Sequence, residues 1–363
     1  MKKLESAPHR SRIKRHPVHG VLLLDKPLGL SSNNALQKCK WLLRAEKAGH
    51  TGTLDPLATG VLPICFGAAT KFSRLQLDAD KTYEAVVRLG VKTSTGDAEG
   101  EIIEEREVPE LTPARLAEIC RQFTGPLRQV PPMHSALKKD GKALYEYARA
   151  GEHVERDARD VVVRELDLAM AGTQSANSSL VLRAKVSKGT YIRTLGEDIG
   201  EALGCGAHLT SLRRVATGHF DISQCITLQA LEAMGEEERL ACLKPVVSLL
   251  PDHTRVTLDA ENAGRFLSGL RRRGKWPDRD RVAVYGPGPS PQPSPASGRG
   301  SIAEDRKEPP LADGRGSLHP LPLAGEGRGE GCLLGTARIK GGELIPVRLL
   351  SPQEISQIME RNQ

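Results

Sequence analysis

A glycine-rich loop around one aspartate constrains this chain more than any other stretch of its sequence. The loop runs from Gly49 to Gly60 and has the sequence GHTGTLDPLATG. Gly49, Gly52 and Gly60 permit positive φ angles or close approach to a ligand, and Pro56 keeps Asp55 out of the helical region. A carboxylate held in this way can be a nucleophile, a general base or an electrostatic partner. An ordinary Asp-Pro turn has the same features, so this pattern alone leaves both interpretations open.

Length and charge narrow the class of protein. The chain has 363 residues and a formal net charge of +7, which suffices for one large domain or two, with a sizeable core. A basic protein suits a polyanion such as nucleic acid, although an enzyme without such a partner can have the same charge. The longest apolar stretch, residues 61–69, is much shorter than a membrane span, and no hydrophobic signal region follows the basic N-terminus. We therefore expect a cytoplasmic protein that does not enter a membrane.

The cysteines and the short motifs argue against several chemistries. The seven cysteines include no CxxC pair, which disfavours a disulfide framework and a zinc site. A phosphate-binding glycine loop, GxGxxG and HExxH are all absent from the sequence, so the commonest nucleotide and metalloprotease signatures are missing. We expect reduced cysteines, no metal and no cofactor.

The N-terminal part combines a basic arm with two regular elements. Residues 1–17 are rich in lysine and arginine and have one acidic residue, Glu5. Such an arm is expected to be flexible, and it could touch RNA phosphates or only keep the protein in solution. Residues 19–24 then predict a strand. Ser31 or Ser32 can cap a following helix with a buried apolar stripe.

The middle of the chain mixes helices and strands. Apolar runs predict strands at residues 81–90, 161–170, 180–187 and 207–220. Thr112 followed by Pro113 predicts a helix start. A later helix, which Thr190 can cap, has an apolar stripe with Tyr191 and Arg193 on its flanks, where a side chain lines a cleft or is simply solvated. Because regular βαβ units are missing, we expect an α+β fold with a mixed or antiparallel sheet.

Two other segments have less regular sequence patterns. Residues 125–160 contain three prolines and then a short basic helical run at 138–145. Beyond Pro251 the composition shifts, with a helix predicted at 256–276 and strands of a small β-domain at 282–285 and 332–350. Between these strands, residues 286–331 are rich in Pro, Gly, Ser and Arg, so they cannot bury a core and are predicted to be disordered.

The stretch GHTGTLDPLATGVLPICFGAATK resembles the signature of the TruB family, the bacterial tRNA pseudouridine-55 synthases. The likeness begins near Gly20 and continues to about Pro251. It implies a pseudouridine synthase domain at 18–251, with a central sheet flanked by helices and a mobile RNA-clamping lobe at about 125–160. Residues 252–363 resemble, more weakly, the RNA-binding PUA domain, interrupted by an insert at 286–331 that the family pattern lacks.

The resemblance also implies an activity. Family members isomerise uridine 55 in the T-arm loop of tRNA: the base is flipped out, its N1–C1′ bond is broken and it is rejoined through C5. The reaction uses no metal or cofactor. The implied partner is the tRNA T-arm stem-loop, and the protein is expected to be a monomer without an obligatory protein partner.

Matching positions in the family motifs assign roles to individual residues. Asp55 corresponds to the essential carboxylate, and Arg193 to the arginine that pairs with it. Tyr83 corresponds to the tyrosine that stacks on the target base and is proposed to help remove the C5 proton. Tyr191 and Leu212 correspond to residues that line the base pocket.

Three further residues are assigned to substrate binding. Lys26, in the family's Lys-Pro motif, and Lys71, in GAATK, are expected to meet the cleft or a phosphate. His50 corresponds to a residue inserted where the flipped nucleotide leaves its stack, although a lone histidine is as often structural. His134 stands where relatives often have tyrosine, and we assign it no role.

Two other functions remain possible on the sequence. The chain could be a tRNA-binding and folding module whose catalysis is secondary. It could also be a guide-RNA-dependent synthase that requires a multiprotein particle. The presence of Asp55, Tyr83 and Arg193 together favours the enzyme, and the near-continuous match to the stand-alone bacterial pattern disfavours the guide-dependent alternative.

Overall fold

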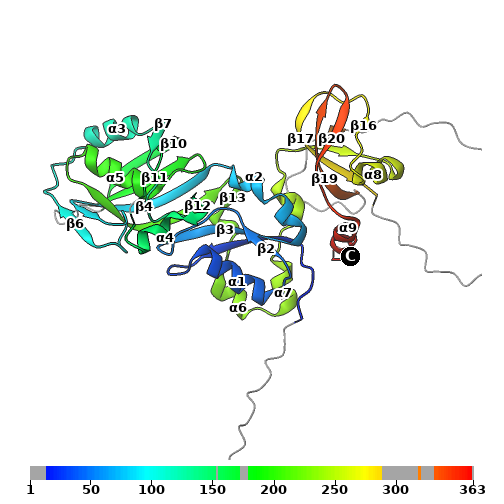
Figure 1. The fold of residues 1–363 in the computed structure, drawn as a ribbon, viewed down its shortest axis with the longest axis horizontal. Helices are drawn as coiled ribbons and strands as arrows, with labels where there is room; N and C mark the ends of the chain where they lie inside the picture. Colours follow the sequence, from blue (N-terminus) through cyan, green and yellow to red (C-terminus); the bar gives the residue numbers. More distant parts are fainter. Residues whose placement is uncertain (1–13, 153, 172–178, 288–317, 320–330, 362–363) are drawn as a thin grey trace, which may run out of the picture. The chain divides into compact units, whose positions relative to one another are not determined.

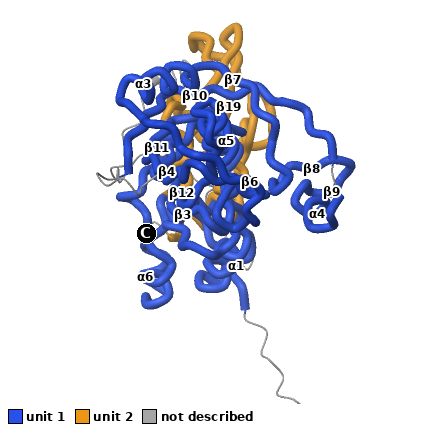
Figure 2. The backbone as a smooth tube through the Cα atoms, turned by 90° about the vertical axis from the view of Figure 1, so that its left-hand side faces the viewer, with its two compact units in different colours: residues 1–66, 73–244 blue, residues 67–72, 245–363 orange. Residues whose placement is uncertain are grey.

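The structure is a computed structural model that describes residues 14–152, 154–171, 179–287, 318–319 and 331–361. Most of the predicted basic arm, the turn at 172–178 and nearly all of the predicted insert lie outside the described residues. The chain divides into two compact units (Figure 2). The first comprises Met1–Phe66 and Ser73–Lys244, and the second comprises Gly67–Phe72 and Pro245–Gln363.

A ten-stranded mixed sheet forms the centre of the first unit (Figure 1). Its strand order is β14 (Ile226–Thr227), β1 (Gly20–Lys26), β3 (Ala58–Phe66), β12 (Ala207–Thr217), β4 (Lys81–Leu89), β11 (Ser179–Val186), β10 (Arg159–Met170) and β7 (Gly125–Gln129), with β2 (Ala48–His50) beside β3 and β13 (Phe220–Asp221) beside β12. The pairs β1–β14 and β3–β12 are parallel, and the others are antiparallel. The expected α+β architecture with a mixed sheet is therefore confirmed.

Helices cover this sheet with the apolar stripes that the sequence predicts. The described helices of the unit, besides α4 (Leu144–Arg149), are α1 (Ser32–Leu42), α2 (Ser73–Leu77), α3 (Pro113–Gln122), α5 (Ile192–Ala202), α6 (Leu228–Ala233) and α7 (Glu236–Ala241), with a 3₁₀ turn η2 (Ile222–Gln224). Ser31 caps α1 and Thr112 caps α3, each by accepting a backbone N–H in the first turn. Gly200 lets α5 lie close to β12, because a Cβ there would be 2.5 Å from the Cβ of Ala207.

The segment predicted as a basic helical run is instead a small hairpin followed by a helix. The hairpin pairs β8 (Lys138–Lys139) with β9 (Lys142–Ala143), and α4 (Leu144–Arg149) follows. Asp140 and Gly141 have φ angles of 52° and 84°, which are the positive values of a tight two-residue hairpin turn. The Asp-Gly pair was the signal that the helix prediction overlooked.

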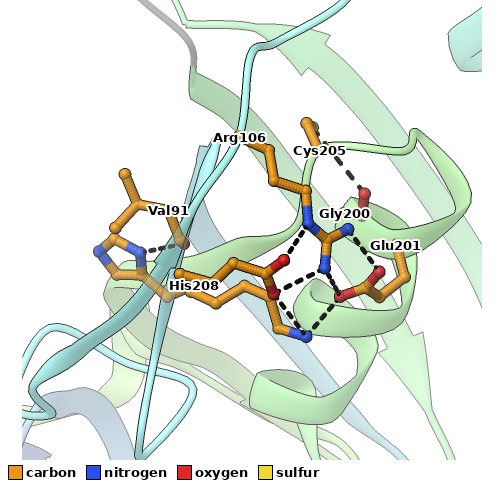
Figure 3. A network of polar contacts seen from close by, with 8 residues as sticks. Val91, Arg106, Gly200, Glu201, Cys205 and His208 are labelled. Carbon is orange, nitrogen blue, oxygen red and sulfur yellow. Dashed lines mark hydrogen bonds and ion pairs between the residues drawn. The ribbon is translucent and has the colours of Figure 1, made fainter.

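A second small hairpin lies at the far end of α5. It pairs β5 (Val91–Thr93) with β6 (Ile102–Glu105). Arg106 donates to Glu104 and to Glu201, and Lys92 donates to Glu201 at 2.5 Å. Figure 3 shows Arg106 and Glu201 of this network. This charge network links the hairpin to the last turn of α5.

The second unit is built on a six-stranded sheet. Its order is β16 (Arg272–Arg273), β20 (Glu343–Leu349), β19 (Cys332–Lys340), β17 (Arg279–Gly286), β15 (Thr254–Thr257) and β18 (Leu318–His319), and the unit also contains η1 (Gly67–Lys71), η3 (Val246–Leu249), α8 (Ala260–Leu267) and α9 (Pro352–Arg361). Strands predicted at 282–285 and within 332–350 are present.

The single helix predicted at 256–276 is wrong. Residues 254–257 form a strand, Asp259 caps the shorter helix α8, and Gly269 follows that helix with a φ of 82°. A capping aspartate and a glycine with positive φ are ordinary helix limits, and they divide the segment. No helix among the described residues is long and apolar enough to cross a membrane.

Candidate active site

The backbone on both sides of Asp55 is held by residues of the preceding loop and helix. The hydroxyl of Ser32 accepts the N–H of Leu54 at 2.7 Å and donates to the carbonyl of Leu54 at 3.0 Å. The N–H of Gly29 donates to the carbonyl of Pro56 at 2.9 Å. Leu54 is itself buried. The carboxylate therefore stands on a fixed segment, and Ser32 has a role here that the sequence did not reveal.

The glycines of the loop are only partly used as predicted. Gly52 and Gly60 have φ angles of 103° and 102°, which favour glycine. Gly49 lies in β2 without a positive φ, and nothing is within 4 Å of a Cβ placed there. Gly49 therefore does not need glycine for its backbone angles, and close approach to a ligand at this position stays a prediction.

Arg193 is buried at the start of α5 and reaches Asp55. Its Nη2 lies 2.9 Å from Oδ2 of Asp55 and donates to the carbonyl of His134 at 2.6 Å. Its Nη1 donates to the carbonyl of Thr95 at 3.0 Å. Arg193 is only 4% exposed, so of its two sequence interpretations the solvated flank is wrong. The ion pair between Arg193 and Asp55 is present, over a sequence separation that no local pattern spans.

A second carboxylate shares this arginine. Oδ2 of buried Asp97 lies 3.4 Å from Nη1 of Arg193. Its other oxygen, Oδ1, accepts from the hydroxyl of Thr95 at 2.6 Å and from the N–H of Glu99 at 3.1 Å. Asp97 is not among the site residues predicted from the sequence. Its place in a turn rich in glycine and aspartate was the available signal, but nothing in that turn points to Arg193.

The start of α5 is arranged differently from the prediction. Tyr191 is the N-cap residue and makes no side-chain cap bond, whereas the hydroxyl of Thr190 donates to the carbonyl of Ser187. Thr190 therefore closes the preceding turn and does not cap the helix. Gln129, buried at the end of β7, holds Tyr191 by accepting its N–H at 3.0 Å and donating to its carbonyl at 3.3 Å.

The sheet register places two other predicted residues in one row across the sheet. Lys26 pairs with Gly60 across β1 and β3, Gly60 pairs with Arg214 across β3 and β12, and Arg214 pairs with Tyr83 across β12 and β4. Leu212 pairs with Ala58 and is buried. Since paired residues on adjacent strands share a face of the sheet, Lys26 and Tyr83 belong to one row that crosses the sheet where the Asp55 loop enters β3.

His50 and Lys71 are the two remaining residues that the sequence assigns to substrate binding. His50 ends β2, is half-buried, and its Nδ1 has no hydrogen-bond partner among the described residues. Lys71 belongs to the second unit, where its Nζ donates to Glu354 at 2.6 Å and to the carbonyl of Leu349 at 2.9 Å. Lys71 is thus already paired with a carboxylate in this structure.

Burial dominates the electrostatics of the site. It raises the pKa of Asp55 above its ordinary value, and the charge of Arg193 acts against this rise. Burial lowers the pKa of Lys26 to about 8, opposed by the charge of Asp55. Burial also raises the pKa of Tyr191. A carboxylate with a raised pKa next to a fixed guanidinium can exchange a proton or stabilise charge.

Within the described ranges, no three His, Cys, Asp or Glu side chains gather in a way that could hold a metal ion. The charged groups that act on Asp55 are the guanidinium of Arg193, the carboxylate of Asp97 and the ammonium of Lys26.

Comparison with known proteins identifies the family. The model of the N-terminal domain of TruB family pseudouridylate synthases matches residues 40–192, and that of the tRNA pseudouridylate synthase B C-terminal domain matches residues 193–250. The tRNA pseudouridine synthase B of Verminephrobacter eiseniae (strain EF01-2) is 57% identical over 96% of this chain and 94% of its own length. The chain belongs to the TruB family.

Other relatives agree with this membership. The tRNA pseudouridine synthase B of Ralstonia pickettii (strain 12J) is 58% identical over 77% of this chain and 88% of its own length. Among solved structures, a chain in the crystal structure of a Cbf5-Nop10-Gar1 complex matches with a TM-score of 0.54 and 26% identity, over 74% of each chain. This TruB family member has the pseudouridine synthase fold, and it is a tRNA pseudouridine synthase, an isomerase.

Proposed function

We propose that this TruB family enzyme isomerises uridine 55 in the T-arm loop of tRNA. In this reaction the N1–C1′ bond breaks, the uracil turns and C5 bonds to C1′. C5 loses a proton and N1 gains one, so product and substrate have the same composition and no oxidant, reductant or other co-reactant is consumed. The proposal therefore includes no cofactor.

The ion pair of Asp55 with Arg193 is the observation that carries this proposal. The reaction needs an ionised carboxylate in a partly dry site, and desolvation disfavours that state. The guanidinium, with its Nη2 2.9 Å from Oδ2 of Asp55, offsets part of this desolvation. We propose Asp55 as the catalytic carboxylate and Arg193 as the residue that keeps it charged and oriented, whether Asp55 attacks the sugar, attacks the base or abstracts a sugar proton.

The remaining site residues would bind the flipped nucleotide. Extruding a base costs a few kcal/mol, and stacking on an aromatic ring returns roughly 1–3 kcal/mol per base. We propose that Tyr83 provides this ring and helps remove the C5 proton, with Tyr191 and Leu212 as the walls of the base pocket. His50 would occupy the position that the nucleotide leaves.

The other RNA contacts would come from basic groups. Lys26 would line the cleft. Lys71 would contact a phosphate after breaking its ion pair with Glu354. We propose that the chain from 18 to 251 is catalytic, with the segment 125–160 as a clamp, and that 252–363 is a PUA-like RNA-binding domain, with 1–17 as an accessory arm and 286–331 as an insert. The enzyme would act as a monomer on cytoplasmic tRNA, without a protein partner.

An Asp55→Asn variant tests the proposal, because it keeps the size of the side chain and removes its charge. Purified wild-type protein and the variant are incubated with transcribed tRNA, and pseudouridine is mapped at single-nucleotide resolution. We expect modification at position 55 with the wild type alone, and loss of at least about 1,000-fold in rate for the variant, on the scale of tenfold per 1.36 kcal/mol of lost transition-state stabilisation.

Binding of tRNA, measured by filter retention, provides the control. A variant that binds tRNA like the wild type but forms no pseudouridine supports catalysis by Asp55. A fully active variant would remove Asp55 from the mechanism. Wild-type protein that needs an added guide RNA or protein would favour the guide-dependent alternative.

A further inference from the structure

Arg214 is a buried cation that the proposed mechanism does not use. It is 1% exposed and is among the largest fully buried side chains of the molecule. Among the described residues, the neighbouring Arg213 forms an ion pair with Asp25, whereas no ion pair includes Arg214. A buried guanidinium without a carboxylate is costly, so its position calls for a structural reason.

Its hydrogen bonds lie on the two sides of Asp55. Nε of Arg214 donates to the carbonyl of Val61 at 2.7 Å, and Nη2 donates to the carbonyl of Gly52 at 3.3 Å. Gly52 precedes Asp55 and Val61 follows it in β3. One side chain thus joins the start of the Asp55 loop to the strand at its end.

The strand register connects the same arginine to Tyr83. Arg214 pairs with Gly60 on one side and with Tyr83 on the other. Gly60 makes this close pairing possible, because a Cβ there would lie 2.1 Å from the carbonyl oxygen of Arg214. Arg214 therefore lies between the loop that carries Asp55 and the strand that carries Tyr83.

We propose that Arg214 is a positioning residue that sets the distance and orientation of Asp55 relative to Tyr83. The planar guanidinium has donors in fixed directions, so it can hold two carbonyls in one geometry. Misplacing a reacting group by about 1 Å can cost about 100-fold in rate. This inference rests on the proposed roles of Asp55 and Tyr83, and it adds Arg214 as the residue that aligns them without contacting the substrate.

Arg214→Lys is the first test, with Arg213→Lys as the matched control. Arg213 is the adjacent residue in β12, and its partly exposed side chain pairs with Asp25. Single-turnover pseudouridine formation is measured with enzyme in excess over tRNA, together with the Kd for tRNA and thermal unfolding. We expect Arg214→Lys to be about 100-fold slower with a Kd within about threefold of wild type, and Arg213→Lys to keep the wild-type rate.

Arg214→Gln covers the case in which lysine does not fold, because its amide can still donate to one of the two carbonyls. A rate loss with intact tRNA binding in either folded variant supports positioning. A wild-type rate in a folded variant overturns the proposal, as does a rate loss matched by an equal loss of tRNA affinity, which would indicate a phosphate contact. If neither variant folds, Arg214 is a folding residue and the proposal fails.

Failure of this inference is distinguishable from failure of the proposed function. If the proposed function were wrong, wild-type protein would not modify uridine 55, or Asp55→Asn would remain active. If only the inference were wrong, wild type would be active and Asp55→Asn inactive, while Arg214→Lys would turn over normally.

Discussion

Helix α5 has a charge cluster at each end, and the two clusters differ in their exposure to water. In the first turn, Arg193 and Asp97 are buried, and Arg193 also contacts Asp55, whose side chain is 37% exposed. In the last turn, the side chain of Glu201 is 42% exposed and contacts Arg106 (Figure 3) and Lys92. Each charge has the sign that the helix dipole disfavours at its end of the helix, so neither is placed for the stability of the helix itself.

The difference in burial decides what each cluster can do. Removing one partner of a buried ion pair costs about 3–5 kcal/mol, because the other charge stays buried without a partner or water. An exposed pair is worth about 0.2–1 kcal/mol, because water replaces the lost partner. We infer that the first cluster controls a reacting carboxylate, whereas the second only fastens the β5–β6 hairpin to the helix.

Arg193→Met should have the largest effect of the substitutions that test this comparison. Asp97 is buried, but the side chain of Asp55 is 37% exposed and water screens part of its loss, so we expect a rate reduced by about two to three orders of magnitude, measured as single-turnover pseudouridine formation. Arg193 lowers the pKa of Asp55 against the effect of burial. Without it that pKa rises further, so activity that needs the carboxylate form should appear at a higher pH.

Arg193→Lys is the control for this experiment. It keeps the charge but lacks the planar fork that meets two carboxylates and two carbonyls, so its rate should fall between those of wild type and Arg193→Met. If Arg193→Met kept its rate within tenfold, the ion pair would not be central to the reaction.

Asp97→Asn should have an intermediate effect. Asp97 forms an ion pair with Arg193 at 3.4 Å, and a neutral amide in its place would leave Arg193 less firmly held, so the misplaced guanidinium should slow the reaction by about 10- to 100-fold. The charge of Asp97 raises the pKa of Asp55. Its removal lowers that pKa, and the acid limb of the pH–rate profile should move to lower pH.

The direction of the pH shift makes this test specific, because Arg193→Met moves the same limb the opposite way. Glu99→Gln is the matched control, since Glu99 lies in the same turn with an exposed side chain, and it should leave both rate and profile unchanged. An Asp97→Asn variant with the wild-type rate and profile would show that Asp97 only holds the turn.

Asp55 could be predicted from the sequence and Asp97 could not, and this difference has a physical reason. The strands and the stripe of α5 follow from burial, which imposes a period of two or 3.6 on apolar residues. Asp55 stands in a loop with glycines and a proline, and in a family motif long enough to recognise. Asp97 and Gln129 acquire their roles only when distant segments meet, so no local pattern marks them.

The wrong predictions have a related cause. Along 138–145 and 256–276, apolar and basic residues suggested helices, but the Asp140-Gly141 turn and the Asp259 cap divide those segments. These were local signals that a reading of periodicity alone outweighed. Arg193 was different: a flank position fits either a solvated or a buried arginine, and only the partners supplied by other segments decide between them.

Glu201→Gln should have the smallest effect. Hydrogen bonds from Arg106 and Lys92 lower the pKa of Glu201 from 4.5 to about 2, so its stabilisation is complete above pH 4.5 and is lost as the pH falls through about 2. At neutral pH we expect chemical denaturation to show a loss of about 0.5–1 kcal/mol in the free energy of unfolding, reduced at high salt. Glu118→Gln, which breaks the isolated pair with Arg115 on α3, should lose less free energy of unfolding.

The rate of pseudouridine formation by Glu201→Gln should stay within about twofold of wild type, because water can solvate Arg106 and Lys92. A rate loss as large as that of Asp97→Asn would mean that the exposed end of α5 controls Arg193, and the contrast between the two clusters would fail.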